Sequence, residues 1–299
     1  MNNAILFFFN INVSNMKRIN NNYYFNYLNN NYGVYLYNRD ITDSIYLYNL
    51  NLELLQRGIP GYYIILTKNR EVIFQYENNY YILMKFPSIN NRNINYEDIK
   101  NFNIEIDSNK YKKIDKSNWS NSWSNKIDFI EYQFKQMKNK YKIIDTYIDY
   151  YIGLWENAIS YFNFNQVIKN KYICHKRVSV DMDLYEYLNP LTFIIDYKER
   201  DIGEYLKSFV MTKSFSLNSL NKYLDNLNRD SIILIISRLL FPSYFFDLYE
   251  NIIIDKIDEN EILKIISKNS NIINTLKYIF NRFSYMNISY IDWIKKEIS

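Results

Sequence analysis

The residues best placed to do chemistry lie between positions 174 and 201. Cys174-His175-Lys176-Arg177 follows an apolar run and precedes two carboxylates, Asp181 and Asp183. A second apolar run, Phe193-Ile194-Ile195, then ends in Asp196. Phosphoryl transfer uses groups in such a layout: one carboxylate accepts the proton of the acceptor hydroxyl, and others hold Mg²⁺. We therefore examine this stretch first as a phosphotransfer site.

The layout resembles that of aminoglycoside-phosphotransferase-like kinases. In that family, a His-x-Asp loop supplies the base, an Asn five residues later holds a metal, and an Asp at the end of a strand holds Mg²⁺. Carried onto this chain, the base position is Arg177, the Asn position is Met182, and the strand-end Asp is Asp196. A guanidinium stays protonated and cannot accept a proton, so the catalytic step lacks its base.

Several roles remain open for the residues of this stretch. We expect His175 to brace the loop rather than to act as an acid or base. Arg177 is expected to form an ion pair with Asp196 or with Asp201, because an Arg–carboxylate pair fills the space that a metal needs. The alternative is residual metal binding by Asp196 with help from Asp181 or Asp183. Arg200-Asp201 is expected to anchor the large lobe, with Asp201 as a helix N-cap.

The usual nucleotide-binding features are also missing. None of the five glycines lies in the first hairpin, where a phosphate-binding loop would be expected. The third strand, from Gly33 to Tyr37, contains no Lys to pair with phosphates, and the stretch to Arg39 offers only that Arg. Glu53, on the covering helix, is therefore interpreted as a solvated or capping carboxylate. The sequence predicts no bound cofactor, with Mg-ATP as the alternative.

Composition limits the other classes of function. Lys and Arg number 36 against 32 Asp and Glu, a formal charge of +4 spread along the chain, so we expect no nucleic-acid partner. With one His and one Cys, a His/Cys zinc site within one chain is excluded. The run 4–9 is too short for a signal peptide, and the run 232–246 is too short for a membrane span. We expect cytoplasmic synthesis and no membrane insertion.

The order of patterns predicts an α+β, protein-kinase-like bilobal fold. Residues 1–86 are expected to form a small antiparallel β lobe with one helix, the hinge or linker region is 87–125, and the helical lobe is 126–299. In the small lobe we predict strands and one helix, at 4–12, 23–28, 33–37, 43–56 (the helix), 62–67, 71–76 and 80–86. In the large lobe we predict helices from 128 onward, interrupted by a strand pair at 171–180 and 192–196. Asp201–Thr212 and Ser231–Phe241 are among those helices.

The chain also resembles the spore-coat kinase-like family of the CotS/YutH type, in its YutH branch. The resemblance is carried by short motifs in the right order along most of the chain. They are Leu55-Gln56-Arg57-Gly58, Ile65-Leu66-Thr67, Tyr80-Tyr81-Ile82-Leu83, Trp119 and Trp123 with Asp128, Gly153-Leu154-Trp155-Glu156-Asn157-Ala158-Ile159, Cys174-His175-Lys176-Arg177, Arg200-Asp201-Ile202-Gly203-Glu204-Tyr205, and Arg238-Leu239-Leu240-Phe241-Pro242. The resemblance implies association with the endospore coat and a His-x-Arg loop typical of the branch.

Together these features predict a catalytically degenerate kinase-like protein with a structural or scaffolding role, assembled on the spore coat. Two alternatives are an active small-molecule phosphotransferase with rewired residues and a non-enzymatic module that binds a ligand in the interlobe cleft. Trp119 and Trp123 are expected to be packing anchors. A scaffold acts through its surface, so we also expect an exposed aromatic patch that binds spore-coat or other proteins.

Overall fold

The computed structural model describes residues 1–212, 215–254 and 256–296. The chain divides into two compact units. The small unit comprises residues 1–94, 107–115 and 181–194, and the large unit comprises 95–106, 116–180 and the chain from 195 onward. Residues 181–194, expected within the helical lobe, thus group with the sheet instead.

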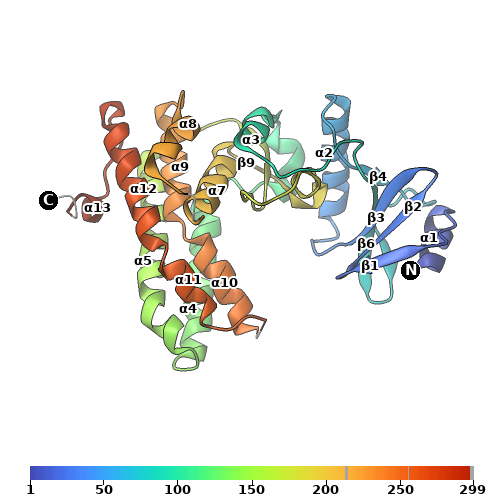
Figure 1. Cartoon of the computed structure of the whole chain (residues 1–299), viewed down its shortest axis with the longest axis horizontal. Coiled ribbons are helices and arrows are strands. Elements are labelled where there is room, and N and C mark those ends of the chain that lie inside the picture. The colour runs from blue at the N-terminus through green and yellow to red at the C-terminus, as the bar shows by residue number, and fades with distance from the viewer. Residues whose placement is uncertain (213–214, 255, 297–299) are drawn as a thin grey trace. The chain divides into compact units, whose positions relative to one another are not determined.

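The small unit is an antiparallel sheet with helices (Figure 1). Its elements are α1 (Asn2–Phe9), β1 (Met16–Ile19), β2 (Asn22–Tyr27), β3 (Asn30–Leu36), α2 (Asp43–Gln56), β4 (Tyr63–Ile65), β5 (Phe74–Tyr76), β6 (Asn79–Lys85), η1 (Ser108–Ile114), α6 (Leu184–Tyr187) and η2 (Pro190–Thr192). The strands lie in the order β1-β2-β3-β6-β4, and β5 also pairs with β6. The predicted antiparallel sheet with one helix after its third strand is confirmed.

Helix α2 has the predicted bounds because its apolar residues follow the helical period. Leu47, Leu50 and Leu54 are buried, and they recur at spacings of three and four residues along one face. The helix ends at Gln56, and Gly58 two residues later has a φ of 75°, a left-handed conformation that costs glycine little. The amide of Gly58 donates to the carbonyl of Leu55, so one of the free carbonyls at the C-terminus of the helix accepts a hydrogen bond.

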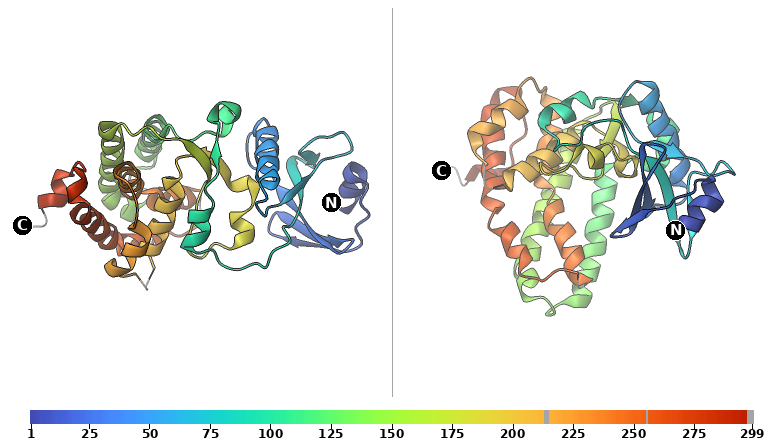
Figure 2. Two further views of the ribbon diagram at one scale, coloured as in Figure 1. Left: turned by 90° about the horizontal axis from the view of Figure 1, so that it is seen from above. Right: turned by 45° about the vertical axis from the view of Figure 1, so that its right-hand side comes forward.

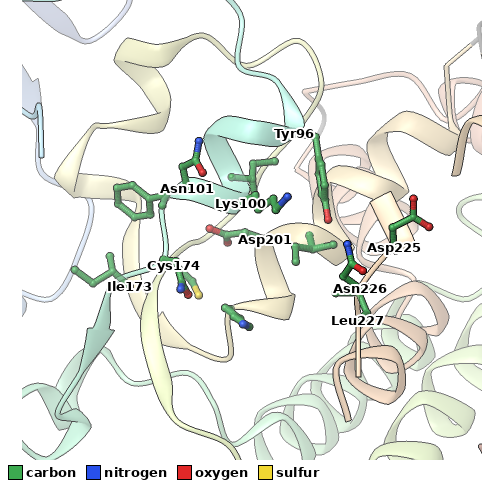
Figure 3. Close-up of a pocket in the computed structure, with 14 residues that line it drawn as sticks. Tyr96, Lys100, Asn101, Ile173, Cys174, Asp201, Asp225, Asn226 and Leu227 are labelled. Atoms are coloured by element: carbon green, nitrogen blue, oxygen red, sulfur yellow. The ribbon is translucent and has the colours of Figure 1, made fainter. Parts of the chain in front are cut away.

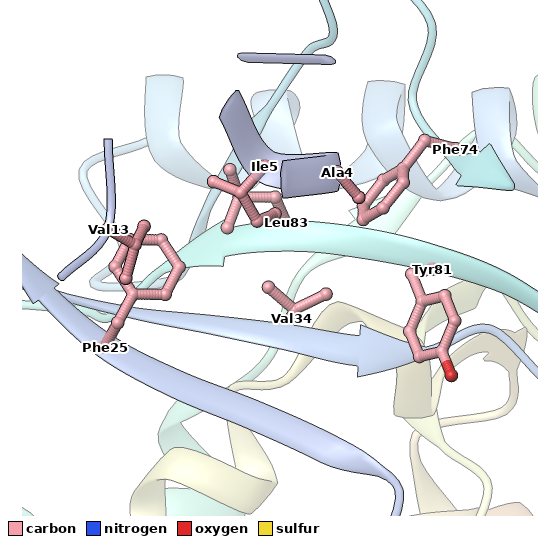
Figure 4. Packing of buried hydrophobic residues seen from close by; sticks show 8 residues of the cluster. All are labelled: Ala4, Ile5, Val13, Phe25, Val34, Phe74, Tyr81 and Leu83. Atoms are coloured by element: carbon pink, nitrogen blue, oxygen red, sulfur yellow. The ribbon is translucent and has the colours of Figure 1, made fainter. Parts of the chain in front are cut away.

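The first segment is a helix, so the strand predicted over residues 4–12 is wrong. Ala4 and Ile5 are buried against Phe25, Val34 and Leu83 of the sheet, as Figure 4 shows. The opposite side of α1 is exposed. In this segment the residues that pack on the sheet and the residues that face water are both apolar. The sequence therefore shows neither the period of a helix nor that of a strand.

The large unit is mainly helical, with a small three-stranded sheet (Figure 2). Its elements are α3 (Tyr96–Asn101), β7 (Glu105–Ile106), α4 (Trp119–Met137), α5 (Lys142–Asn165), β8 (Lys171–His175), β9 (Phe193–Asp196), α7 (Glu199–Val210), η3 (Leu217–Leu220), α8 (Asn221–Leu224), α9 (Arg229–Leu240), α10 (Ser243–Ile253), α11 (Glu261–Ile266), α12 (Asn269–Arg282), η4 (Ser284–Met286) and α13 (Asp292–Lys296). Strand β9 passes from the small unit into the large one, and the sheet order is β7-β8-β9.

The region predicted as a linker is more structured than its polar composition indicated. Between residues 87 and 125 lie α3, β7, η1 and the first two turns of α4. Asn95 and Asp98 form a capping box at the start of α3, with the Asn95 side chain accepting from the amides of Glu97 and Asp98. Helix α4 begins at Trp119 rather than at Asp128.

The most apolar helical segment runs from Arg229 to Ile253 and includes α9 and α10. By length and composition it could cross a membrane, but 83% of its most apolar window is buried inside the structure. Every residue of α9 from Ser231 to Leu240 is buried. That burial is what a core helix of a folded domain requires.

Candidate functional site

Asp196 lies fully buried at the end of β9, and both of its carboxylate oxygens accept hydrogen bonds. The indole Nε1 of Trp119 donates to both carboxylate oxygens, at 2.8 and 3.0 Å. Arg200 Nη1 donates to Oδ2 at 2.8 Å, and the amide of Tyr197 donates to Oδ1 at 2.8 Å. Burial raises the pKa of Asp196, against the lowering effects of Arg200 and Trp119. A metal ion at this carboxylate would have to displace Trp119 or Arg200.

Arg200 also connects Asp196 to the loop that follows β8. Its Nε donates to the carbonyl of His175 at 2.9 Å, and its Nη2 donates to the carbonyl of Lys176 at 3.1 Å. Arg200 stands four residues after Asp196, one turn into α7, so its side chain reaches back along the helix to the strand end. The guanidinium therefore occupies the side of Asp196 that faces the His-x-Arg loop.

His175 is a buried bracing residue. Its backbone amide donates to Asp201 Oδ1 at 2.9 Å, and its Nδ1 lies 2.6 Å from Asp201 Oδ2. Phe102 packs against the imidazole with ring centroids 5.1 Å apart. Asp201 is therefore not the predicted N-cap. That position is Lys198, and Asp201 lies in the first turn of α7 with both carboxylate oxygens directed to His175.

Arg177 does not pair with Asp196 or Asp201, so that prediction is wrong. Its Nε and Nη2 donate to the two carboxylate oxygens of Asp247, at 2.7 and 2.6 Å, and Glu204 lies 4.0 Å away. Although burial acts to lower it, the pKa of Arg177 is held above its usual range by Glu204 and Asp247. Arg200, and not Arg177, lies beside Asp196. Arg177 instead pairs with Asp247 of α10.

The two carboxylates that could have helped Asp196 belong to the small unit. Asp183 caps α6: its Oδ1 accepts from the amide of Glu186 at 2.8 Å, and its Oδ2 accepts from Asn91 Nδ2 at 3.0 Å. Asp181 is exposed, and Met182, at the position expected for the metal-binding Asn, is buried. Among the described residues, no group of three or more His, Cys, Asp or Glu side chains is arranged to hold a metal ion.

A buried charge cluster lies next to Arg177, and the sequence did not predict it. Glu204 pairs with Lys207 at 3.0 Å and with Arg238. Lys207 also donates to the carbonyl of Phe241 at 2.9 Å and to Ser243 Oγ at 3.0 Å. Burial lowers the pKa of Lys207 to about 7, even though Glu204 acts in the opposite direction. The sequence signal was the Glu–Lys spacing of three within α7, together with Arg238 inside the apolar run of α9.

Trp119 and Trp123 are packing anchors, as predicted. Both are buried, and their rings stack with centroids 5.2 Å apart. The guanidinium of Arg238 lies over both rings, at 5.2 and 5.6 Å. Trp119 in addition holds Asp196, and this role was not anticipated because the two residues are 77 positions apart.

In the small unit, aromatic rings fill the sheet face on which a kinase would carry its phosphate-pairing Lys. Gly33 and Tyr35 share a face because they lie two residues apart on β3, and Tyr24 is directly opposite Gly33. The Tyr35 ring lies over Gly33 so closely that a Cβ there would be 2.4 Å from it. Tyr62 and Phe86 complete the cluster, with ring centroids 6.1 and 6.5 Å from Tyr35.

Arg39 and Glu53, the two charged residues of the small unit considered for a nucleotide site, both make contacts within the fold. Arg39 Nη1 donates to the carbonyls of Leu191 and Phe193, at 3.2 and 2.7 Å, so it fixes the segment before Asp196. Glu53 pairs with Arg57 at 2.6 Å and accepts from the hydroxyl of Tyr111 at 2.9 Å. Glu53 thus links α2 to Tyr111 and forms an i,i+4 ion pair, but it caps neither end of the helix, because an ionised carboxylate cannot donate to the last carbonyls.

A pocket of about 340 Å³ in the large unit borders the His175–Asp201 pair (Figure 3). Residues of α3, β8, the start of α7 and the loop after α8 line it. Cys174 is at this pocket, but its Sγ contacts the carbonyl of Tyr197 at 3.2 Å, and burial raises the pKa of the thiol well above its usual range. A thiol held protonated is a poor nucleophile, so this pocket supplies no obvious reacting group.

Comparison with known proteins identifies the family of this chain. Residues 2–278 match the family described as "Spore coat putative kinase YutH". The endospore coat-associated protein YutH of Bacillus subtilis strain 168 is 27% identical over 241 residues, which are 70% of each chain.

Solved structures show the same fold at low sequence identity. An aminoglycoside phosphotransferase from Alicyclobacillus acidocaldarius superimposes with a TM-score of 0.59 at 8% identity, covering 91% of this chain and 93% of that one. The AMP-bound spectinomycin phosphotransferase gives 0.60 at 12% identity, over 93% and 96%. Because the family match extends over most of the sequence and the fold is that of the phosphotransferases, the chain belongs to the YutH family of spore-coat kinase-like proteins.

Proposed function

We propose that this protein is a catalytically inactive, kinase-like structural component of the spore coat. The observation that carries the proposal is the enclosure of Asp196 by Trp119, Arg200 and the Tyr197 amide. In an active phosphotransferase the strand-end carboxylate must offer its oxygens to Mg²⁺. Here both oxygens accept hydrogen bonds inside the core, so metal binding requires breaking a buried ion pair.

Two further features support inactivity. Arg177 stands at the base position and is held by Asp247, and losing a general base alone lowers rates by roughly 10²–10⁴. On the small unit, Tyr35 takes the inner sheet face where a phosphate-pairing Lys would project. These are three separate losses, involving the base, the metal ligand and the phosphate contact.

Nucleotide binding is the direct test of the inactive site. We expect millimolar Mg-ATP to leave the thermal unfolding midpoint of the full chain unchanged. A ligand present at 100 times its Kd would add about 2.7 kcal/mol of stability, which is easily seen. Micromolar Mg-ATP binding by calorimetry that Asp196→Asn abolishes would refute the proposal and favour an active, metal-dependent phosphotransferase.

The spore-coat assignment rests on the family and on the Bacillus subtilis relative. A tagged copy expressed in a sporulating Bacillus should fractionate with the extracted coat layers. Recovery only in the spore core would contradict this location.

We further propose that a coat protein docks on an exposed aromatic face of α4. Phe129 and Tyr132 are 57% and 66% exposed, and they lie three residues apart on the same side of the helix. Aromatic residues bury much area with few rotatable bonds, which suits them to interfaces. Replacing both by Ser should reduce recovery in the coat fraction, whereas Phe164→Ser on α5, where the side chain is 75% exposed, should not. Equal recovery of the double variant and the wild type would remove this role.

A further inference from the structure

Two adjoining pockets form a groove on the small unit, and neither includes a residue of the Asp196 site. Their volumes are about 490 and 550 Å³, and both are lined by Asn31, Phe86 and Tyr185. Each volume lies in the range of natural small-molecule sites. We propose that this groove, defined by Lys17, Tyr24, Asn26, Asn31, Phe86 and Tyr185, binds an oligosaccharide that is neutral or carries a single acidic group.

The sheet register brings a cation, an aromatic ring and two amides to one face. Lys17 of β1 lies directly opposite Tyr24 of β2, and Asn26 of β2 lies directly opposite Asn31 of β3. Tyr24 and Asn26 are two residues apart, so their side chains project from the same side of the sheet. The grouping is therefore fixed by strand pairing and does not depend on a mobile loop.

Three half-buried rings line the groove in a chain. The centroids of Tyr24 and Phe86 are 6.2 Å apart, and those of Phe86 and Tyr185 are 5.1 Å apart. The hydroxyl of Tyr185 donates to the carbonyl of Ile89 at 3.1 Å, which holds that ring in place. Aromatic rings whose position is set before binding provide apolar area at a low entropic cost. The apolar C–H face of a sugar ring is complementary to such a surface.

The polar groups of the groove suit hydroxyls. The side chains of Asn26, Asn31 and Lys17 make no hydrogen bond to other side chains or backbone in the described part of the molecule. Each amide offers both donors and an acceptor, as a ligand rich in hydroxyls requires.

The charge of the groove limits the ligand further. Lys17 is the single charged residue among those that line the two pockets. One cation does not support a polyanion such as a nucleic acid, and it leaves room for one acidic substituent.

The groove is also poorly suited to a nucleotide. The inner part of this face is filled by the Tyr35 ring over Gly33, so a base could not lie flat on the strands there. Because two pockets adjoin, the groove matches a ligand of more than one ring. The proposal does not depend on whether the protein is catalytically active.

The test is an array of immobilised oligosaccharides, neutral and acidic, probed with the labelled full chain. We expect retention on at least one of them, weakened about tenfold or more by Asn26→Ala and by Tyr24→Leu. The matched controls are Asn163→Ala and Tyr285→Leu, which change exposed residues of the large unit. Because Asn26 is exposed, its variant keeps the fold even if Tyr24→Leu does not, and thermal unfolding verifies this.

Three results of this experiment would overturn the proposal. Retention on no oligosaccharide, or retention that neither groove variant weakens, shows that the amides and rings reflect only the Asn- and Tyr-rich composition. Displacement of the bound oligosaccharide by ATP shows that the groove is a nucleotide site.

Discussion

Replacing the buried Lys207 by Met should change how stability depends on pH. Lys207 is fully enclosed in the large unit and faces Glu204, Arg238 and Arg177, together with the Phe241 carbonyl and Ser243 Oγ. Burial lowers its pKa from 10.5 to about 7. The guanidiniums of Arg238 and Arg177 also lower this pKa, whereas Glu204 raises it. Met has a similar length and helix propensity but does not titrate.

The number of protons bound in each state decides whether stability rises or falls with pH. Between pH 7 and 10.5 the unfolded chain keeps the proton on this lysine and the folded chain loses it. The unfolded state therefore binds more protons, and stability rises with pH in this window. With these two pKa values, the free energy of unfolding should increase by roughly 2–3 kcal/mol between pH 6 and pH 9. In Lys207→Met this contribution is absent.

Urea unfolding followed by tryptophan emission measures the effect on the correct part of the molecule. All four tryptophans, at positions 119, 123, 155 and 293, belong to the large unit. The wild type should gain stability from pH 6 to 9 relative to Lys207→Met, whereas Lys135→Met, at an exposed site on α4, should follow the wild type. Parallel pH curves for the wild type and Lys207→Met would refute the reasoning, because Lys207 would then remain charged in its ion pair throughout.

Two other substitutions test the packing around the site, and a third, on α5, serves as a control. Gly203→Ala places a Cβ 2.7 Å from the Cβ of Arg238 where α7 crosses α9, and we expect a loss of about 1–3 kcal/mol in urea unfolding. Gly153→Ala on α5 meets no atom within 4 Å and should stabilise by about 0.5–1 kcal/mol, so equal effects of the two would contradict the crossing. Trp119→Phe removes the indole donor to the buried Asp196 and should cost about 1.5–3 kcal/mol. A stability unchanged by Trp119→Phe would show that this hydrogen bond is not important for the core.

The fold could be predicted from the sequence where local patterns are strong. The bounds of α2 follow from its leucine spacing and from Gly58, and the end of β9 at Asp196 follows from an apolar run closed by a carboxylate. Strand β1 was missed because it is short and almost wholly exposed, so it lacks the alternation that marks a strand. Local pattern therefore succeeds where one face is buried and fails at an exposed edge.

The partners within the site could not be predicted, because packing far along the chain selects them. Arg177 and Asp247 are 70 residues apart, and Trp119 and Asp196 are 77 apart. Several carboxylates near Arg177 satisfied the same chemical rule, and the sequence offered no distance with which to choose among them. Arg200 decided the outcome: it reaches Asp196 from one helical turn away, and a local contact of this kind forms with little loss of chain entropy.

Trp119, Arg200 and Tyr35 make buried contacts that support the core, and under the proposed inactive function these contacts also oppose a return to activity. Removing Trp119 or Arg200 to admit a metal would leave Asp196 as a buried carboxylate with fewer donors, which is strongly destabilising. Removing Tyr35 would open a cavity above Gly33 in the small unit. The loss of stability at Asp196 falls in the large unit and the loss at Tyr35 falls in the small unit. Because both sites would have to change, no single substitution restores a kinase site. These stability costs are consistent with the structural role proposed above.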